Sequence, residues 1–194
     1  MNNRYAFVAG NSGPWRLSSM KTLRGPDLSP AQRIDFVHAD ARDADAPASW
    51  VLHGVMSNVR YATRTEMGAL KASQEPLGRP NARRAALIPI KKSAAWWELA
   101  QDERRAIFEE TSHHTAIGLE YLPAIARQLF HCREIDEPFD FLTWFEYAPE
   151  HATEFENLVT RLRSTPEWSY VEREVDIRLE RIGVHDQSPY VKTP

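Results

Sequence analysis

The run VEREVDIRLERI at residues 171–182 alternates apolar and charged side chains with a period of two. This alternation is typical of an antiparallel β-strand with one face on a hydrophobic core and the other in solvent. Short apolar runs bounded by loop residues predict further strands at Arg4–Gly10, 85–92 (AALIPIKK) and 139–147 (FDFLTWFEY). Residues 50–70 are also expected to be extended chain. A sheet with one solvated face therefore makes up much of the fold.

Helical patterns lie between these strands. In LSPAQRIDFVHADARDA, Ser29 is the expected N-cap and Pro30 the first helical residue, which predicts a helix over 29–41. A second helix is expected from about Ala94 to the histidine pair at 113–114, because this stretch contains no Gly or Pro. The apolar residues that recur at helical spacing in the first helix are Ile34, Val37 and Ala41.

A last helix is predicted for residues 148–163. Gly118 and Pro123 are expected to break the path of the chain before AIARQLFHCRE at 124–134. The polar segment SQEPLGRPNARR at 73–84 is expected to form a surface loop. The last helix carries its apolar stripe on Phe155, Leu158, Val159 and Leu162.

The resulting order is strand, helix, strands, then helix, strands, helix, strand. This order predicts an α+β fold of two ferredoxin-like halves, about 1–90 and 91–194. The halves would form an antiparallel β-barrel-like core with helices outside. Because the gap between them is too short for a flexible linker, we expect a single domain.

Composition narrows the class of protein. A net charge of −3 over 194 residues gives no global case for a nucleic-acid partner or an anionic membrane. The single cysteine excludes an internal disulfide framework and fits a reducing compartment. The start of the chain, MNNRYAFVAGNSGPW, has no apolar core of the length found in secretory signals. We therefore expect a soluble cytoplasmic protein.

The next feature is the pair of adjacent histidines, His113 and His114, of which one can point toward the interior. In a continuous helix, His114 would lie about 20° from Ile107 and Ala100, whereas His113 would share a polar sector. An inward histidine is either a hydrogen-bonded core residue or a metal ligand. Zinc is poorly supported, because the sequence has no HExxH or CxxC motif. A single histidine suits haem better, because the porphyrin supplies four of the iron ligands.

At this point the chain resembles the chlorite dismutase family of haem proteins, from roughly Trp50 to Ile182. The resemblance rests on HGVMSNVRYATRTE, IPIKKSAAWWEL, the histidine-bearing segment, Arg127 and RSTPEW, in this order and at these spacings. It implies haem b as cofactor and conversion of chlorite to chloride and dioxygen. In that reaction a ferryl intermediate and transient hypochlorite form and then recombine.

The resemblance also implies roles for individual residues. His114 matches the axial ligand of the haem iron, and Glu167 the acid that accepts its hydrogen bond, although composition alone favours a solvated turn residue at 167. Arg127 matches the catalytic arginine that holds hypochlorite near the iron, and Gln74 is expected to hydrogen-bond that arginine. The residues expected to line the haem and hold its propionates are Arg60, Tyr61, Lys92 and Trp96, with Trp97 in the aromatic wall beside the axial histidine.

Other readings stay open. A coproheme decarboxylase would keep the axial histidine, but members of that group typically lack an arginine at the position of Arg127. A non-enzymatic haem-binding or stress-response protein, or a cofactor-free barrel with a core histidine, are the further alternatives. The short segment before Trp50 resembles the short branch of the family, which implies a homodimer rather than a pentamer.

Overall fold

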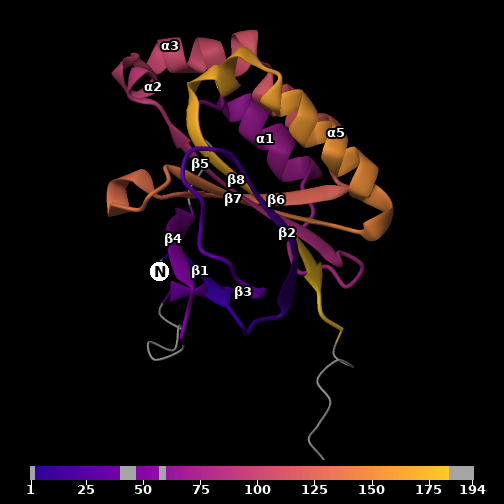
Figure 1. The fold of residues 1–194 in the computed structure, drawn as a ribbon. Helices are drawn as coiled ribbons and strands as arrows, with labels where there is room; N and C mark the ends of the chain where they lie inside the picture. Colours follow the sequence, from indigo (N-terminus) through magenta and orange to yellow (C-terminus); the bar gives the residue numbers. More distant parts are fainter. Residues whose placement is uncertain (1–2, 40–46, 57–59, 184–194) are drawn as a thin grey trace, which may run out of the picture.

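The structure is a computed structural model, and it describes residues 3–39, 47–56 and 60–183. Eight strands close an antiparallel barrel in the order β1-β3-β2-β8-β5-β7-β6-β4 (Figure 1). The predicted α+β class with an antiparallel barrel core is confirmed. The strands are β1 (Arg4–Gly10), β2 (Trp15–Arg24), β3 (Arg33–His38), β4 (Trp50–Met56), β5 (Arg84–Lys92), β6 (Ile125–His131), β7 (Phe141–Tyr147) and β8 (Val171–Arg181).

The strand order contains the same pattern twice. In the C-terminal half, the strands follow one another along the chain as β5, β6, β7 and β8, with helices after β5 and after β7, which is the β-α-β-β-α-β sequence of a ferredoxin-like unit. In the sheet their order is β8-β5-β7-β6, so the fourth strand lies beside the first. The N-terminal strands follow the same order, β4-β1-β3-β2. Pairing of β2 with β8 and of β4 with β6 joins the two sets and closes the barrel. A division into halves at about residue 90 falls inside β5.

The helices gather over the C-terminal strands. In Figure 1, α1, α2, α3 and α5 lie on the side of β5–β8, and the N-terminal strands form the opposite end. None of the helices in the described ranges is long and apolar enough to span a membrane. The helices are α1 (Arg64–Ser73), α2 (Ala94–Glu98), α3 (Gln101–Arg105), a π-helix (Ala106–Thr111), α4 (His114–Glu120) and α5 (Ala152–Arg163), with 3-10 turns at Arg133–Ile135, Pro149–His151 and Pro166–Tyr170.

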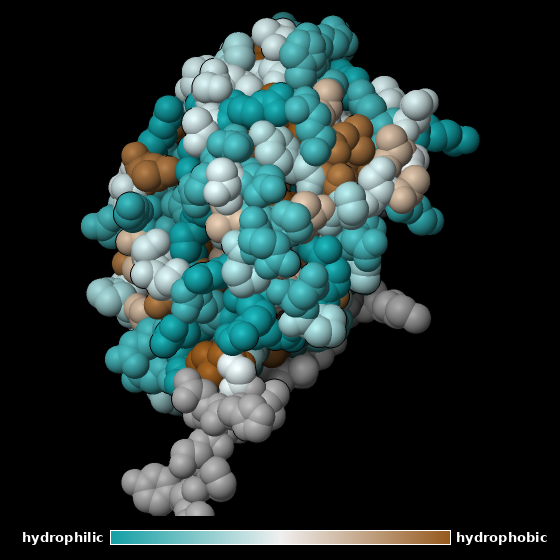
Figure 2. All heavy atoms as spheres, turned by 90° about the vertical axis from the view of Figure 1, so that its right-hand side faces the viewer, coloured by the Kyte–Doolittle hydropathy of each residue, from teal (hydrophilic) through white to brown (hydrophobic). Residues whose placement is uncertain are grey.

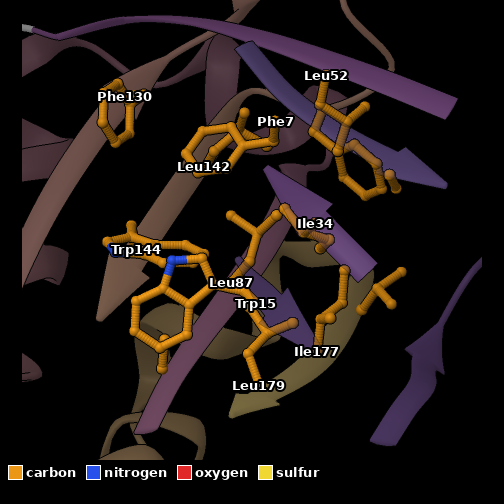
Figure 3. Close-up of a cluster of buried hydrophobic side chains, with 14 of the residues drawn as sticks. Phe7, Trp15, Ile34, Leu52, Leu87, Phe130, Leu142, Trp144, Ile177 and Leu179 are labelled. Atoms are coloured by element: carbon orange, nitrogen blue, oxygen red, sulfur yellow. The ribbon is translucent and has the colours of Figure 1, made fainter. Parts of the chain in front are cut away.

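Two apolar layers hold this arrangement. The inside of the barrel is filled by aromatic and aliphatic side chains from all strand sets (Figure 3). Trp15 and Trp144 meet edge to face there with ring centroids 5.3 Å apart. The second layer lies between β5–β8 and α5, and it includes the stripe predicted for that helix. On the face seen in Figure 2, hydrophilic residues dominate and hydrophobic ones form small separate patches.

The predicted helix over 29–41 is wrong, because the segment contains β3 instead. Ile34 is fully buried in the barrel, and Phe36, two residues further on, stacks on Phe7 at 4.8 Å. The side chains that pack therefore follow a period of two, and pairing of β3 with β1 and β2 outweighs the local helix signals. Ala41 lies outside the described residues.

The expectation of extended chain over 50–70 is confirmed for β4 but wrong for α1. The helix begins with a capping box, in which Thr63 and Glu66 each accept a hydrogen bond from the other's backbone N–H, at 3.3 and 2.7 Å. The TRTE spacing at 63–66 is a sequence signal for this helix start.

The long helix predicted from Ala94 to the histidine pair is also wrong. Leu99 and Ala100 are extended and separate α2 from α3. A π-helix follows α3, and His113 adopts the left-handed region with φ 51° before α4 begins. Gly118 does not break the path, because α4 continues through it to Glu120. The premise of a continuous helix used to orient His114 therefore fails.

The predicted strand at 171–182 is confirmed as β8, but the middle of its charged face is not in solvent. Glu174 and Asp176 are buried, with 1% and 6% exposure. Arg163 of α5 donates to both carboxylates, at 2.8 Å to Glu174 and 2.7 Å to Asp176. Alternation marked the two faces correctly, but it carried no information on the helix that covers the charged one.

Candidate active site

A cavity lies between the outward face of β5–β7 and the helical segments. It encloses about 1020 Å³ of empty space when the region open to solvent at its mouth is counted. Successive strand residues point to opposite faces of a sheet, so the residues of each strand that line this cavity are two apart in the sequence. The strand residues that line it are Ile88, Ile90 and Lys92 of β5, Ile125, Arg127 and Leu129 of β6, Phe141, Thr143 and Phe145 of β7, and Glu174 of β8.

His114, the first residue of α4, also lines the cavity. Its Nδ1 lies 2.7 Å from Glu167 Oε2, and its ring stacks on Phe108 with centroids 4.3 Å apart. Because the carboxylate holds Nδ1, that nitrogen carries the proton and donates it. The lone pair of Nε2 is then available to a ligand in the cavity.

Glu167 is part of a buried charged group. Lys92 Nζ donates to Glu167 Oε1 at 2.7 Å, and the two side chains are 2% and 4% exposed. The ammonium also lies over the Trp96 ring at 4.7 Å. Burial alone would raise the pKa of Glu167, but His114 and Lys92 outweigh burial and lower that pKa to about 2. Burial lowers the pKa of Lys92, and attraction to Glu167 opposes that change.

The residues just before α4 are hydrogen-bonded both to the Glu167 turn and to the start of α4. Ser112 is buried, and its Oγ accepts the backbone N–H of Glu167 at 3.0 Å. Glu109 is also buried, and its carboxylate accepts the N–H groups of Thr115 and Ala116. The protein therefore fixes the start of α4 and the Glu167 turn through side-chain to backbone hydrogen bonds.

Arg127 reaches the same cavity from β6. Its cross-strand partner in β7 is Phe145, and Gly118 of α4 lies against its guanidinium, because a Cβ at Gly118 would be 3.8 Å from Arg127 Cζ. No hydrogen bond to its guanidinium is found within the described residues. Burial lowers the pKa of Arg127, and the charge of Glu109 opposes this shift. The group stays charged at neutral pH because an arginine pKa is ordinarily above about 12.

Three more of the predicted residues line the cavity. Trp96 is 1% exposed, and its Nε1 is buried without a hydrogen-bond partner in the described part of the chain. Tyr61 has a left-handed backbone with φ 66° and packs its ring on Trp96 and Phe108. Arg60 is ion-paired with Glu134 at 2.5 Å. All three contribute polar groups to a largely apolar wall.

Two predicted residues do not line the cavity. Trp97 lies behind its wall, where the indole stacks on Phe141 and donates to Asp140 Oδ2 at 3.1 Å. Gln74 is exposed at the C-cap of α1, and no hydrogen bond joins it to Arg127 within the described residues. The structure thus brings together His114, Glu167, Arg127, Lys92, Trp96, Arg60 and Tyr61, and leaves Trp97 and Gln74 outside.

Several cavity residues were missed by reasoning from the sequence. Phe108, Thr143 and Trp168 line the site, and Glu109 and Ser112 support it. The alternation of FDFLTWFEY places Thr143 on the same face as Phe141 and Phe145, so this residue could have been found. No signal of spacing or composition marks Glu109, because its role depends on a turn that the helical pattern conceals.

The donor set fits a haem. Groups of three or more His, Cys, Asp or Glu side chains that could hold a bare metal ion are not found among the described residues. One imidazole with a free Nε2 suits iron that is already held by a porphyrin. The volume and apolar wall suit a large planar ligand, and the unpartnered Trp96 Nε1 is a donor for a carboxylate.

Comparisons with known proteins show which family the chain resembles. Residues 34–182 match the family model described as chlorite dismutase. The chlorite dismutase of Ideonella dechloratans is 38% identical over 86 residues, which are 44% of this chain and only 28% of that protein. The chain therefore matches less than a third of the length of this relative.

Solved structures extend the similarity to nearly the whole chain. A dimeric chlorite dismutase from Nitrobacter winogradskyi is 58% identical, with a TM-score of 0.85 and coverage of 92% of this chain and 99% of that chain. A chlorite dismutase from Candidatus Nitrospira defluvii in complex with imidazole is 21% identical, with a TM-score of 0.64 and coverage of 92% of each chain. The second match shows a shared fold alone.

Proposed function

The chain belongs to the chlorite dismutase family, and from this premise we propose that it converts chlorite to chloride and dioxygen with haem b as cofactor. The observation that carries the proposal is one apolar cavity lined by both a carboxylate-bound histidine, His114, and an arginine without a partner in the described residues, Arg127. The first is suited to an iron ligand and the second to a small anion.

His114 would hold the iron through Nε2. Glu167 accepts the Nδ1 proton at 2.7 Å, and its low pKa keeps it anionic at neutral pH. An anionic acceptor gives the imidazole more imidazolate character, which stabilises iron in high oxidation states. Lys92 fixes the orientation of the carboxylate. The Lys92 ammonium is already paired with Glu167 and is therefore not free to bind a haem propionate. We propose instead that the propionates are held by Trp96 Nε1 and by the Arg60 and Tyr61 side chains, which line the cavity.

Arg127 would act on the anions. Bound haem would supply the oxygen-atom transfer chemistry that converts chlorite, through transient hypochlorite, to chloride and dioxygen. The Arg127 guanidinium keeps its positive charge at neutral pH and does not serve as a proton donor. We assign it the electrostatic task of holding hypochlorite near the iron until the O–O bond forms. The apolar side chains around it strengthen that attraction by excluding water.

The relative from Nitrobacter winogradskyi is described as dimeric. Since this chain is 58% identical to it over 92% of its length, we propose that the protein is a homodimer. Sedimentation equilibrium should then give about twice the 22.3 kDa of one chain. A mass equal to one chain would contradict the dimer.

The direct test is oxygen release from chlorite by the haem-reconstituted protein, followed with an oxygen electrode. We expect rapid oxygen release by the wild-type protein and none above free haem by His114→Ala, because the iron then lacks its axial ligand. A haem-loaded wild-type protein that releases no oxygen would refute the proposal. Carbon dioxide release from coproheme would then favour the decarboxylase, and neither reaction would favour a haem-binding protein.

A further inference from the structure

We propose that Glu109 is a positioning residue for the axial histidine: its carboxylate fixes the first turn of α4 and thereby directs the His114 imidazole toward the cofactor. This inference rests on the proposed role of His114 as the haem ligand. Glu109 belongs to neither the His114–Glu167–Lys92 group nor the strand residues that line the cavity.

The first argument is the hydrogen bonding of Glu109. Its Oε2 accepts the Thr115 N–H at 2.6 Å, and its Oε1 accepts the Ala116 N–H at 3.1 Å. These N–H groups belong to the first turn of α4, where an α-helix has no carbonyl partners of its own. The N-cap residue, His113, provides no side-chain hydrogen bond. The Glu109 side chain, which is 8% exposed, therefore caps the N-terminus of α4 although it lies five residues before the first helical residue.

The second argument is the backbone between Glu109 and His114. Glu109 lies in the π-helix, and His113 adopts left-handed angles that a non-glycine residue rarely takes without support. If the helix ran on regularly, the Thr115 and Ala116 N–H groups would bond to carbonyls of the preceding turn. The position of His114 relative to Glu167 would then change. The Glu109 carboxylate stabilises the broken path over the regular one.

The third argument is that the same turn holds the other partners of the imidazole. Phe108 stacks on the His114 ring, and Ser112 accepts the Glu167 N–H at 3.0 Å. A shift of the α4 start would disturb the distance from His114 Nδ1 to Glu167 Oε2. The charge of Glu109 also attracts Arg127. A test must therefore separate the hydrogen bonds of this carboxylate from its charge.

Two variants make that separation. Glu109→Asp keeps the charge but is one methylene too short to reach both N–H groups. Glu109→Gln keeps the length and loses the charge, and its amide nitrogen faces an N–H that needs an acceptor. If anchoring matters, both variants are affected; if only the charge near Arg127 matters, the aspartate behaves as wild type. Glu110→Gln is the matched control, because Glu110 is adjacent and exposed.

The first measurement uses the haem-free protein. Hydrogen exchange of the segment 112–118, followed by mass spectrometry, should be about tenfold faster in Glu109→Asp and Glu109→Gln than in Glu110→Gln. The second uses the haem-loaded protein: the iron–histidine stretching band in the resonance Raman spectrum should shift or broaden, and the haem dissociation constant should rise about tenfold. A merely structural role would lower the unfolding midpoint and leave the Raman band of the folded protein unchanged.

The inference would be overturned if both variants kept the exchange rate, the Raman band and the haem affinity of Glu110→Gln. The inference would also be overturned if Glu109→Gln were affected while Glu109→Asp behaved as the wild type, because the charge acting on Arg127 would then explain the effect. Failure of the wild-type protein to bind haem is a different result, since it refutes the proposed function itself.

Discussion

Replacement of Arg127 by alanine is expected to lower the dioxygen released per haem before inactivation by about one to two orders of magnitude. The reason is the loss of a charged hydrogen-bond donor, worth about 1.5–3 kcal/mol where water is excluded. Without the guanidinium, hypochlorite would leave before it recombines with the oxygen atom that chlorite gave up, and it would bleach the haem. Oxygen yield, the Soret band and a halogenation trap for free hypochlorite measure the three consequences in one experiment.

Two variants control this prediction. Arg127→Lys keeps the positive charge and loses the planar fork, so it should fall between wild type and alanine. Arg16→Ala removes an arginine that is 61% exposed and ion-paired with Glu180, and it should behave as wild type. Equal oxygen yield and equal bleaching in Arg127→Ala and Arg16→Ala would contradict the role assigned to Arg127.

Replacement of Glu167 by glutamine is expected to lower the free energy of unfolding of the haem-free protein by about 3–4 kcal/mol at pH 7. The substitution removes the ion-pair partner of the Lys92 ammonium, which is 2% exposed, and removal of one partner of a buried ion pair typically costs about 3–5 kcal/mol. The measurement is urea unfolding of both proteins under identical conditions.

The same pair predicts a pH dependence. The pKa of Glu167 is lowered from 4.5 to about 2 in the folded protein. A carboxyl with a lowered pKa stabilises the fold above its unfolded-state value and loses that contribution as pH falls toward the folded-state value. The difference between wild type and Glu167→Gln should therefore shrink between pH 4.5 and 2, by roughly 2 kcal/mol at pH 3.

The control for this prediction is Glu172→Gln. Glu172 pairs with Lys91 at 3.1 Å, but both side chains are more than 40% exposed, at 43% and 46%. An exposed pair contributes at most about 1 kcal/mol. A Glu167→Gln variant that loses no more stability than Glu172→Gln, or a difference that does not change with pH, would show that the buried pair does not act as described.

Much of the site could be predicted because its residues lie in patterned segments. The resemblance placed Arg127 at the site, and strand alternation in β6 does turn it toward the cavity. The inward direction of His114 was inferred from a continuous helix, which the structure does not have. The predicted direction was therefore correct, although the argument for it was wrong. The pairing of Lys92 with Glu167, 75 residues apart, had no local signal.

The sequence by itself determined which segments form β1, β5, β7, β8 and α5, because periodicity records which side of each segment meets an apolar environment. It also carried the resemblance that identifies the family. Only the tertiary structure decided that residues 33–38 form a strand, that Glu174 and Asp176 of β8 are buried beneath α5, and that Glu109 anchors the His114 turn. The physical reason is that the periodicity of apolar residues shows which face of a strand or helix is buried, whereas the element that covers that face comes from a distant part of the chain.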